Sequence, residues 1–141
     1  MLKDKATQYT NKRSKESIDW QGRKILIVED DPLSMRFLYT ILKETGADLL
    51  VANNGQEALD TVSNHDRLDL ILMDIQLPFM NGHEVTLKIR EFDSNIPIIA
   101  QTAHAMSEDR ERCIQSGCTD YITKPIDIEL LFDKICKYIQ K

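Results

Sequence analysis

Side chains that could bind a cation or a phosphoryl group follow four apolar stretches of the sequence. Glu29-Asp30-Asp31 follows the first stretch, Asp74 and Thr102 follow two later ones, and Lys124-Pro125 follows the last. If these stretches are neighbouring strands of a parallel sheet, their carboxyl ends meet at one edge, where α/β sheets bind ligands. Several carboxylates, a hydroxyl and an ammonium group would then share one pocket.

Such a group of carboxylates favours a divalent cation, because the charges otherwise repel one another. Mg²⁺ is commonly held by one or two carboxylates together with water and phosphate oxygens. Asp31 precedes Pro32 and is expected to cap a helix, which leaves Glu29 and Asp30 for the metal. A carboxylate that points into a metal pocket, here Asp74, can act as a nucleophile and form an aspartyl phosphate. Taken singly, these acids could equally be solvated helix-start residues and a turn cap.

Thr102 and Lys124 are the residue types that a phosphoryl group would require. A hydroxyl donates to one phosphate oxygen, and an ammonium group pairs with another. Either residue alone could be an ordinary strand threonine or a surface lysine. Their joint placement with Asp74 at strand ends therefore favours a site of phosphoryl transfer.

The elements that must position these residues alternate between strands and helices. Five apolar runs lie at 25–28, 49–51, 70–73, 96–100 and 121–122, the fourth interrupted by Pro97. Most are continuous rather than alternating, as in parallel strands buried on both faces. Helical periodicity is found at 33–45, 56–64, 83–92, 108–116 and 128–139, with Ser107 and Asp127 as expected caps. The alternation predicts a doubly wound α/β domain. Acids replace the dinucleotide-binding glycines after the first run, which favours a flavodoxin-like (βα)5 sheet of order 2-1-3-4-5.

Composition excludes several classes of protein. The chain has 141 residues and a formal net charge of −5, which argues against direct nucleic-acid binding. No apolar run is long enough to span a membrane, and no secretory signal is present, so we expect a cytoplasmic protein. Three cysteines, Cys113, Cys118 and Cys136, form no disulfide framework or zinc motif, and we expect ordinary, partly buried thiols.

The first 20 residues differ from the rest of the chain because they are polar and show no apolar periodicity. We expect residues 1–20 to be a flexible leader or linker and 21–141 to form the domain. The alternative is that Ile18 and Trp20 pack on the edge of the domain. His65 and His83 are expected to be ordinary helix-end or loop residues.

From about residue 23 to 138, the chain resembles a two-component response-regulator receiver domain. The matching features are Glu29-Asp30, Asp74-x-x-x-Pro78-x-x-x-Gly82, Thr102-Ala103, Tyr121 and Lys124-Pro125. The resemblance implies that Asp74 is the phosphoacceptor. It also implies that Asp30 binds Mg²⁺ directly, with Mn²⁺ as a second candidate, and that Glu29 binds it through water. The backbone carbonyl of Gln76 would complete the metal ligands.

The resemblance further implies a switch. Lys124, joined to Pro125 by a cis peptide, would contact the phosphoryl group, and Thr102 would hydrogen-bond to it. Tyr121 would turn inward when Thr102 moves. The output surface would be the helix, strand and helix within residues 104–139, through which a homodimer could form.

The implied donor is a phosphohistidine on a sensor histidine kinase or a histidine phosphotransfer domain, and the chain would be a signalling domain rather than an enzyme. Ile75, Gln76 and His104 differ from the commonest pattern of the family, and the last two occupy positions that tune the phosphoryl lifetime. Whether the chain is a stand-alone regulator or the receiver portion of a hybrid kinase stays open.

Three other functions are alternatives to a phosphorylated receiver domain. A haloacid-dehalogenase-like, Mg²⁺-dependent phosphatase needs a second aspartate where this chain has Gln76. A flavodoxin would place an FMN phosphate against Glu29-Asp30, which would repel it. The third is a receiver-like interaction module that works without phosphorylation, although such modules usually lose one of the acidic or lysine residues that this chain keeps.

Overall fold

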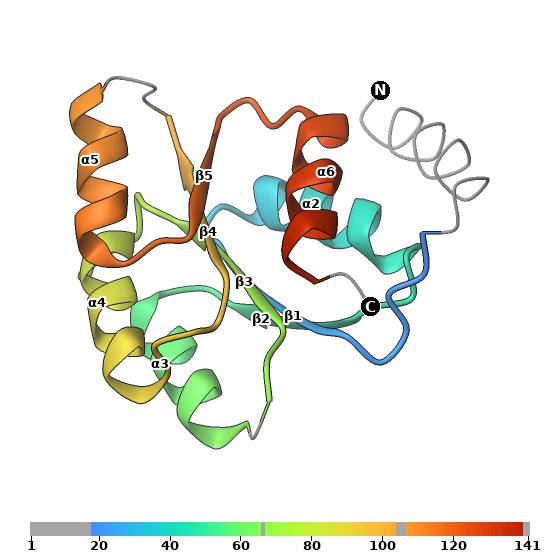
Figure 1. Ribbon diagram of the computed structural model, residues 1–141, viewed down its shortest axis with the longest axis horizontal. Helices are drawn as coiled ribbons and strands as arrows, with labels where there is room; N and C mark the ends of the chain where they lie inside the picture. The colour runs from blue at the N-terminus through green and yellow to red at the C-terminus, as the bar shows by residue number, and fades with distance from the viewer. Residues whose placement is uncertain (1–17, 66, 104–106, 140–141) are drawn as a thin grey trace.

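The computed structural model describes residues 18–65, 67–103 and 107–139, which form five strands and five helices (Figure 1). The strands are β1 (Lys24–Val28), β2 (Asp48–Ala52), β3 (Leu70–Asp74), β4 (Ile98–Thr102) and β5 (Asp120–Thr123). The helices are α2 (Pro32–Lys43), α3 (Gly55–Asn64), α4 (Gly82–Phe92), α5 (Ser107–Ser116) and α6 (Ile128–Tyr138). None of these helices has the length and apolar character needed to cross a lipid bilayer.

The strands form one parallel sheet in the order β2-β1-β3-β4-β5, which confirms the predicted order. Asp74 pairs with Gln101, and Thr102 pairs with Thr123. The carboxyl ends of β3, β4 and β5 therefore lie level with one another at the same edge of the sheet.

Helices cover both faces of the sheet: α2 and α6 lie on one face, and α3, α4 and α5 lie on the other (Figure 1). All five residues of β3 are buried, and so are four of the five residues of β1. Alternate side chains of β1, β3 and β4 enter the two apolar cores, one beneath α2 and α6 and the other beneath α3 and α4. Burial on both faces explains why these runs are continuous in the sequence rather than alternating.

Side-chain caps set the beginnings of the helices. Asp31 accepts a hydrogen bond from the Ser34 N–H (3.0 Å), and Asp127 accepts one from the Leu130 N–H (3.2 Å), both as expected. α5 differs from the prediction, because it begins at Ser107 itself rather than after it. β4 begins at residue 98 instead of 96, and the carbonyl of Pro97, which has no N–H of its own, accepts from Ile71 of β3 (2.9 Å).

Ile18 and Trp20, which precede the first strand, pack on the domain. Residues 1–17 lie outside the described residues, but Ile18 and Trp20 pack on the core beneath α2 and α6. The Trp20 side chain is 5% exposed, and its ring centroid lies 5.5 Å from that of Phe132 in α6. Its backbone N–H donates to the carbonyl of Thr45 (2.8 Å). The packing of Ile18 and Trp20, the alternative raised by the sequence, is therefore what the structure shows.

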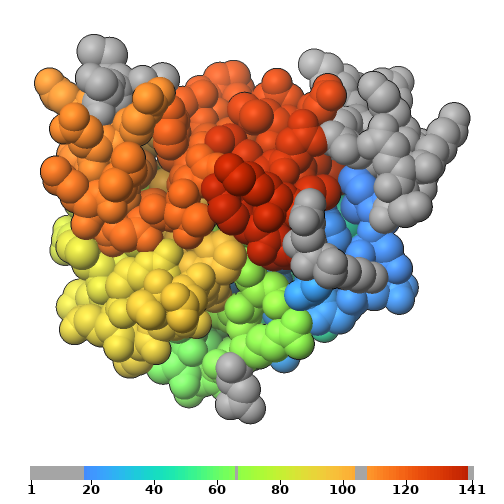
Figure 2. All heavy atoms as spheres, in the orientation of Figure 1, coloured from blue at the N-terminus to red at the C-terminus, as the bar shows by residue number. Residues whose placement is uncertain are grey.

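Arg90 in α4 joins three parts of the chain at one corner of the domain. Its guanidinium donates to the carbonyls of Gly117 (2.8 Å), Ile96 (2.7 Å) and Asp93 (3.2 Å), and to the hydroxyl of Thr119 (3.3 Å). The end of α4, the start of β4 and the turn from α5 into β5 are thereby tied together. In Figure 2, α5 and α6, coloured orange and red, belong to one broad face of the molecule, which also includes residues of β5.

Candidate functional site

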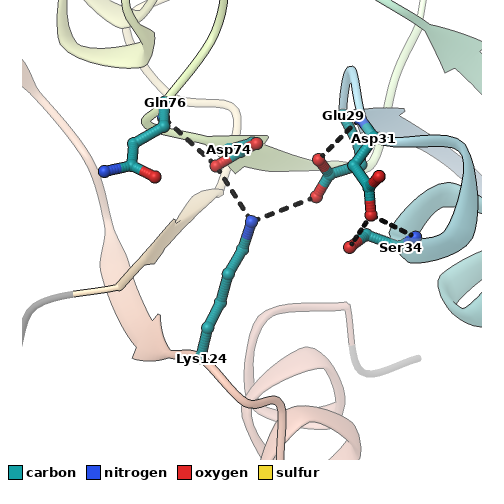
Figure 3. A network of polar contacts seen from close by, with 6 residues as sticks. All are labelled: Glu29, Asp31, Ser34, Asp74, Gln76 and Lys124. Carbon is teal, nitrogen blue, oxygen red and sulfur yellow. Dashed lines mark hydrogen bonds and ion pairs between the residues drawn. The ribbon is translucent and has the colours of Figure 1, made fainter.

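The side chains predicted to form a pocket come together at the carboxyl edge of the sheet. Lys124, just after β5, extends its Nζ to 3.2 Å from Asp74 Oδ1 and 3.3 Å from Glu29 Oε1 (Figure 3). Asp74 is the last residue of β3, and Glu29 directly follows β1. One ammonium group thus bridges two carboxylates that come from neighbouring strands.

Asp74 is buried, with 2% of its surface exposed, and its carboxylate is held in place by two donors. Oδ1 accepts from Lys124 Nζ and from the backbone N–H of Gln76 (3.1 Å). The backbone N–H of Ile75, the residue directly after Asp74, donates to the carbonyl of Gln101 (3.1 Å) and so continues the pairing of β3 with β4. The strand and the first turn beyond it therefore fix the carboxylate at the rim of the pocket.

The loop from β3 to α4 folds back closely over Asp74. The Gly82 N–H donates to the carbonyl of Ile75 (2.9 Å), and a Cβ at position 82 would lie 2.4 Å from the carbonyl oxygen of Asp74. Phe79 has a φ of 68° and a fully exposed side chain in the middle of this loop. The glycine eight residues after Asp74 is thus required by the close approach of two backbone segments.

Three carboxyl groups could hold a metal ion at this position. Glu29, Asp30 and Asp74 each offer one oxygen, and these oxygens all lie within 4.8 Å of one another. Asp30 is exposed, whereas the other two are buried. Three acids facing the single ammonium group of Lys124 leave an excess of negative charge, and hard oxygen donors suit a divalent cation such as Mg²⁺.

Burial changes the protonation of this pocket. It raises the pKa of Glu29 to about 7, and the hydrogen bond that Glu29 shares with Asp74 adds to the effect. Burial alone would lower the pKa of Lys124, but attraction to Asp74 and Glu29 outweighs it and raises that pKa. Glu29 and Asp74 therefore share the ammonium group of Lys124 in a buried, carboxylate-rich pocket.

Asp31 stands beside the pocket as a capping residue. Its carboxylate accepts from the N–H and the hydroxyl of Ser34, and these bonds lower the pKa of Asp31 (Figure 3). Its own backbone N–H donates to Glu29 Oε2 (3.1 Å). The start of α2 therefore orients Glu29 and leaves Asp30 as the exposed acid of the cluster.

Thr102 and Tyr121 lie on the neighbouring strands. Thr102 is 5% exposed, and its carbonyl accepts from the Lys124 N–H (2.8 Å). Tyr121 is half-buried, and its hydroxyl accepts from Arg110 Nε of α5 (2.9 Å). Arg110 and Lys134 both lie against the Tyr121 ring, at 5.5 and 5.7 Å from its centroid. No motif pointed to Arg110; the only signal in the sequence is its place on the helix that directly precedes the strand of Tyr121.

A crevice of about 290 Å³ opens next to Lys124, between α2 and the loop that joins β5 to α6. Its lining is mostly apolar: Leu33, Phe37, Leu38, Pro125 and Ile126 contribute, together with Ser34, Gln101 and Lys124. The Lys124–Pro125 peptide is cis, and Leu33 is 76% exposed. The Gln101 amide is buried and finds no hydrogen-bond partner within the described part of the chain. His104, expected near the phosphoryl site, lies outside the described residues.

Comparison with known proteins identifies a family. Residues 25–136 match the model of the response regulator receiver domain. The polar-differentiation response regulator DivK of Brucella anthropi is 43% identical over 119 residues, which cover 83% of this chain and 96% of DivK. Hybrid signal transduction histidine kinase I of Dictyostelium discoideum is 42% identical over 131 residues, which cover 84% of this chain but only 8% of that kinase.

Solved structures give the same result. The receiver domain of the sensor histidine kinase PA1611 from Pseudomonas aeruginosa, with a magnesium ion coordinated in its active site cleft, aligns with a TM-score of 0.78 at 34% identity, over 85% of this chain and 99% of that one. The Saccharomyces cerevisiae receiver domain of Ssk1, in complex with the histidine phosphotransfer protein Ypd1, aligns with a TM-score of 0.79 at 32% identity, over 84% and 90% of the two chains.

Proposed function

Because the chain belongs to the response-regulator receiver domain family of two-component and phosphorelay signalling, we propose that Asp74 is its phosphoacceptor. The observation that carries the proposal is the placement of the Asp74 carboxylate. It is buried at a strand end, held by Lys124 and the Gln76 N–H, and faced by two further acids. This arrangement fixes one nucleophile beside the charges that a phosphoryl group needs.

In the proposed reaction, a carboxylate oxygen of Asp74 attacks the phosphorus of a phosphohistidine. A P–O bond forms, the P–N bond breaks, and its electron pair returns to the imidazole nitrogen. Lys124 already lies at hydrogen-bond distance from Asp74, so its ammonium group can pair with a phosphoryl oxygen. The hydroxyl of Thr102, a residue at the end of the adjacent strand, would donate to another.

Glu29, Asp30 and Asp74, together with the backbone carbonyl of Gln76, are proposed to hold Mg²⁺. The bound ion would supply positive charge that stabilises the phosphoryl oxygens. Mn²⁺, with the same charge and a preference for oxygen ligands, is the second candidate. The support is the three-carboxylate cluster, together with the magnesium ion in the cleft of the Pseudomonas domain.

Phosphorylation would work as a switch because it converts one negative charge on Asp74 to about two. The new oxygens would draw Thr102 and Lys124 toward the site. Movement of Thr102 would leave room for Tyr121 to turn inward, and Tyr121 would then release Arg110. The change would be transmitted to α5, β5 and α6, the surface through which we also propose that a homodimer can form.

We propose a histidine kinase or a histidine phosphotransfer domain as the donor. The apolar crevice beside Lys124 and the exposed side chain of Leu33 offer such a partner a docking surface next to Asp74. The yeast complex of Ypd1 with a receiver domain supports this class of partner. All three cysteines are thiols rather than disulfides, which fits the proposed cytoplasmic setting.

Intact-mass measurement after incubation with Mg²⁺ and acetyl phosphate tests the proposal. We expect a gain of about 80 Da, one phosphoryl group, that requires both Mg²⁺ and Asp74. The Asp74→Asn variant should gain nothing, whereas Asp60→Asn, which alters an exposed acid of α3, should react like the wild type. Labelling that survives in Asp74→Asn would reject Asp74 as the acceptor. A wild-type chain that stays unlabelled, under conditions that label another receiver domain, would favour an interaction module that works without phosphorylation.

A further inference from the structure

Cys113 and Cys118 are held together by the turn that ends α5. The Gly117 N–H donates to the carbonyl of Ile114 (3.0 Å), and the Cys118 N–H donates to the carbonyl of Cys113 (2.9 Å). Gly117 has a φ of +100°. These two bonds and the left-handed glycine define a Schellman motif, in which the residues at the positions of Cys113 and Cys118 touch. The backbone therefore brings two thiols side by side.

The two thiols have different surroundings. Cys118 is half-buried, and its sulfur lies 3.7 Å from Ser116 Oγ and 3.9 Å from Thr86 Oγ1. The Cys118 thiol donates to Thr86 Oγ1. A hydrogen bond from the Cys113 thiol outweighs burial and lowers the pKa of Cys118 to about 7, and the contacts with Ser116 and Thr86 act in the same direction. The same bond to Cys118, followed by burial, raises the pKa of Cys113, which is 2% exposed.

This asymmetry is typical of a reactive thiol pair. A partly exposed thiolate is the sulfur that oxidants attack, and a neutral thiol in contact with it can resolve the product. The guanidinium of Arg90, bonded to the carbonyl of Gly117, adds positive charge next to Cys118. Cys136 differs, because it packs on the core beneath α2 and α6, on the opposite face of the sheet from Cys118.

We propose that Cys113 and Cys118 form a dithiol site that hydroperoxides oxidise reversibly to a disulfide. The Cys118 thiolate attacks one oxygen of the hydroperoxide, the O–O bond breaks, and an alcohol leaves once it has taken up a proton. The sulfenic acid formed on Cys118 is then attacked by the sulfur of Cys113. An S–S bond forms, the S–O bond breaks, and water leaves. The two cysteines lose two electrons and two protons in total, and the hydroperoxide is reduced to an alcohol and water.

The site would act outside the phosphoryl pocket and is independent of the proposed role of Asp74. A Cys113–Cys118 disulfide would replace the contacts of the Cys118 sulfur with Thr86 and Ser116. It would therefore change how the end of α5 rests on α4, in the region that leads into β5.

Peptide mapping with trypsin separates the cysteines cleanly. Cleavage follows Arg112 and Lys134 but not Lys124, which precedes proline, so Cys113 and Cys118 share the peptide 113–134 and Cys136 is released in another. The folded chain is treated at pH 7 with tert-butyl hydroperoxide, alkylated without reduction, and digested. We expect peptide 113–134 to lose about 2 Da and to escape alkylation, at least about tenfold faster than Cys136 reacts, and a thiol reductant to reverse the change.

Variants and an unfolded control make the test decisive. Cys136→Ser should oxidise like the wild type, whereas Cys118→Ser should leave Cys113 as an alkylatable thiol. The preference over Cys136 should disappear when the same treatment is carried out in concentrated urea. The proposal is overturned if peptide 113–134 keeps two alkylatable thiols in the folded chain, if Cys136 reacts as fast, or if the unfolded chain forms the disulfide with the same preference.

Discussion

Replacing Trp20 with alanine would remove the indole ring that packs against Phe132 of α6. A tryptophan side chain buries about 150–250 Å², which at about 25 cal/mol per Å² corresponds to about 4–6 kcal/mol of transfer free energy. Trp20 is 5% exposed, so nearly all of this applies, although residual structure in the unfolded chain reduces it. We therefore expect the free energy of unfolding to fall by about 3–4 kcal/mol, within the range measured for buried aromatic residues.

Urea unfolding followed by far-ultraviolet circular dichroism measures this change, because the substitution removes the only tryptophan of the chain. Leu33→Ala, at an apolar residue that is 76% exposed, is the matched control and should cost less than about 0.5 kcal/mol. Trp20→Phe should fall between the two variants. A loss of less than about 1 kcal/mol for Trp20→Ala would refute the packing argument and return the start of the folded domain to residue 21.

Three further predictions concern the site and its surroundings. In Gly82→Ala the new Cβ must move from 2.4 Å to at least 3.0 Å from the Asp74 carbonyl oxygen, a shift of 0.6 Å or more. Because this shift displaces the backbone of Asp74, we expect acetyl phosphate labelling to slow by about tenfold or more. Labelling at the wild-type rate would contradict the argument that the two backbone segments approach too closely for a side chain. Arg110→Met removes the hydrogen bond to the Tyr121 hydroxyl, which is worth about 0.5–1.5 kcal/mol. If this bond stabilises the unphosphorylated form, acetyl phosphate labelling should speed up by about two- to tenfold. Slower labelling would contradict this role of the Arg110–Tyr121 bond. Burial alone would raise the pKa of Asp120, but hydrogen bonds from the lysine and tyrosine of α6 and from a backbone N–H outweigh it and lower that pKa. The stability that this carboxylate contributes is present above its unfolded pKa of about 3.9 and is lost as the pH falls through its folded pKa. The difference in urea midpoint between wild type and Asp120→Asn should therefore disappear between about pH 5 and pH 2.5. A difference that stays constant with pH would disprove that ionised Asp120 stabilises the fold.

The fold and the acidic pocket could be predicted because their signals are local. Each strand is a short apolar run, and the residues that follow β1, β3 and β5 carry the charges that meet at the sheet edge. Asp31 followed by Pro32 is likewise a local signal, because it predicts the start of α2 from two adjacent residues. Once a parallel order is inferred, the convergence of Glu29, Asp74 and Lys124 follows from topology alone.

Features that depend on distant partners were not predictable in this way. The packing of Trp20 could be raised only as an alternative, because Trp20 stands in a polar stretch and no periodicity connects it to Phe132, against which it packs. Arg110 and Tyr121 meet only because α5 packs beside β5. The cysteine pair was expected to be unremarkable thiols, although the glycine between Cys113 and Cys118 was a usable signal for the turn that joins them. His83, expected to be an ordinary loop or helix-end residue, is buried between α4 and α5, with Nδ1 3.2 Å from Ser116 Oγ.

The four bonds of Arg90 have a mechanical consequence for the domain. The rigid, planar guanidinium donates hydrogen bonds to four oxygens on three segments. Movement of one segment therefore weakens the hydrogen bonds to the other two. The turn from α5 into β5 should therefore be displaced only when several of these hydrogen bonds break together, rather than by gradual lengthening of each. On the opposite face, α2 packs on the sheet through apolar side chains, whose contacts are non-directional and tolerate small sliding movements. The corner held by Arg90 should therefore be displaced abruptly, whereas α2 can shift gradually.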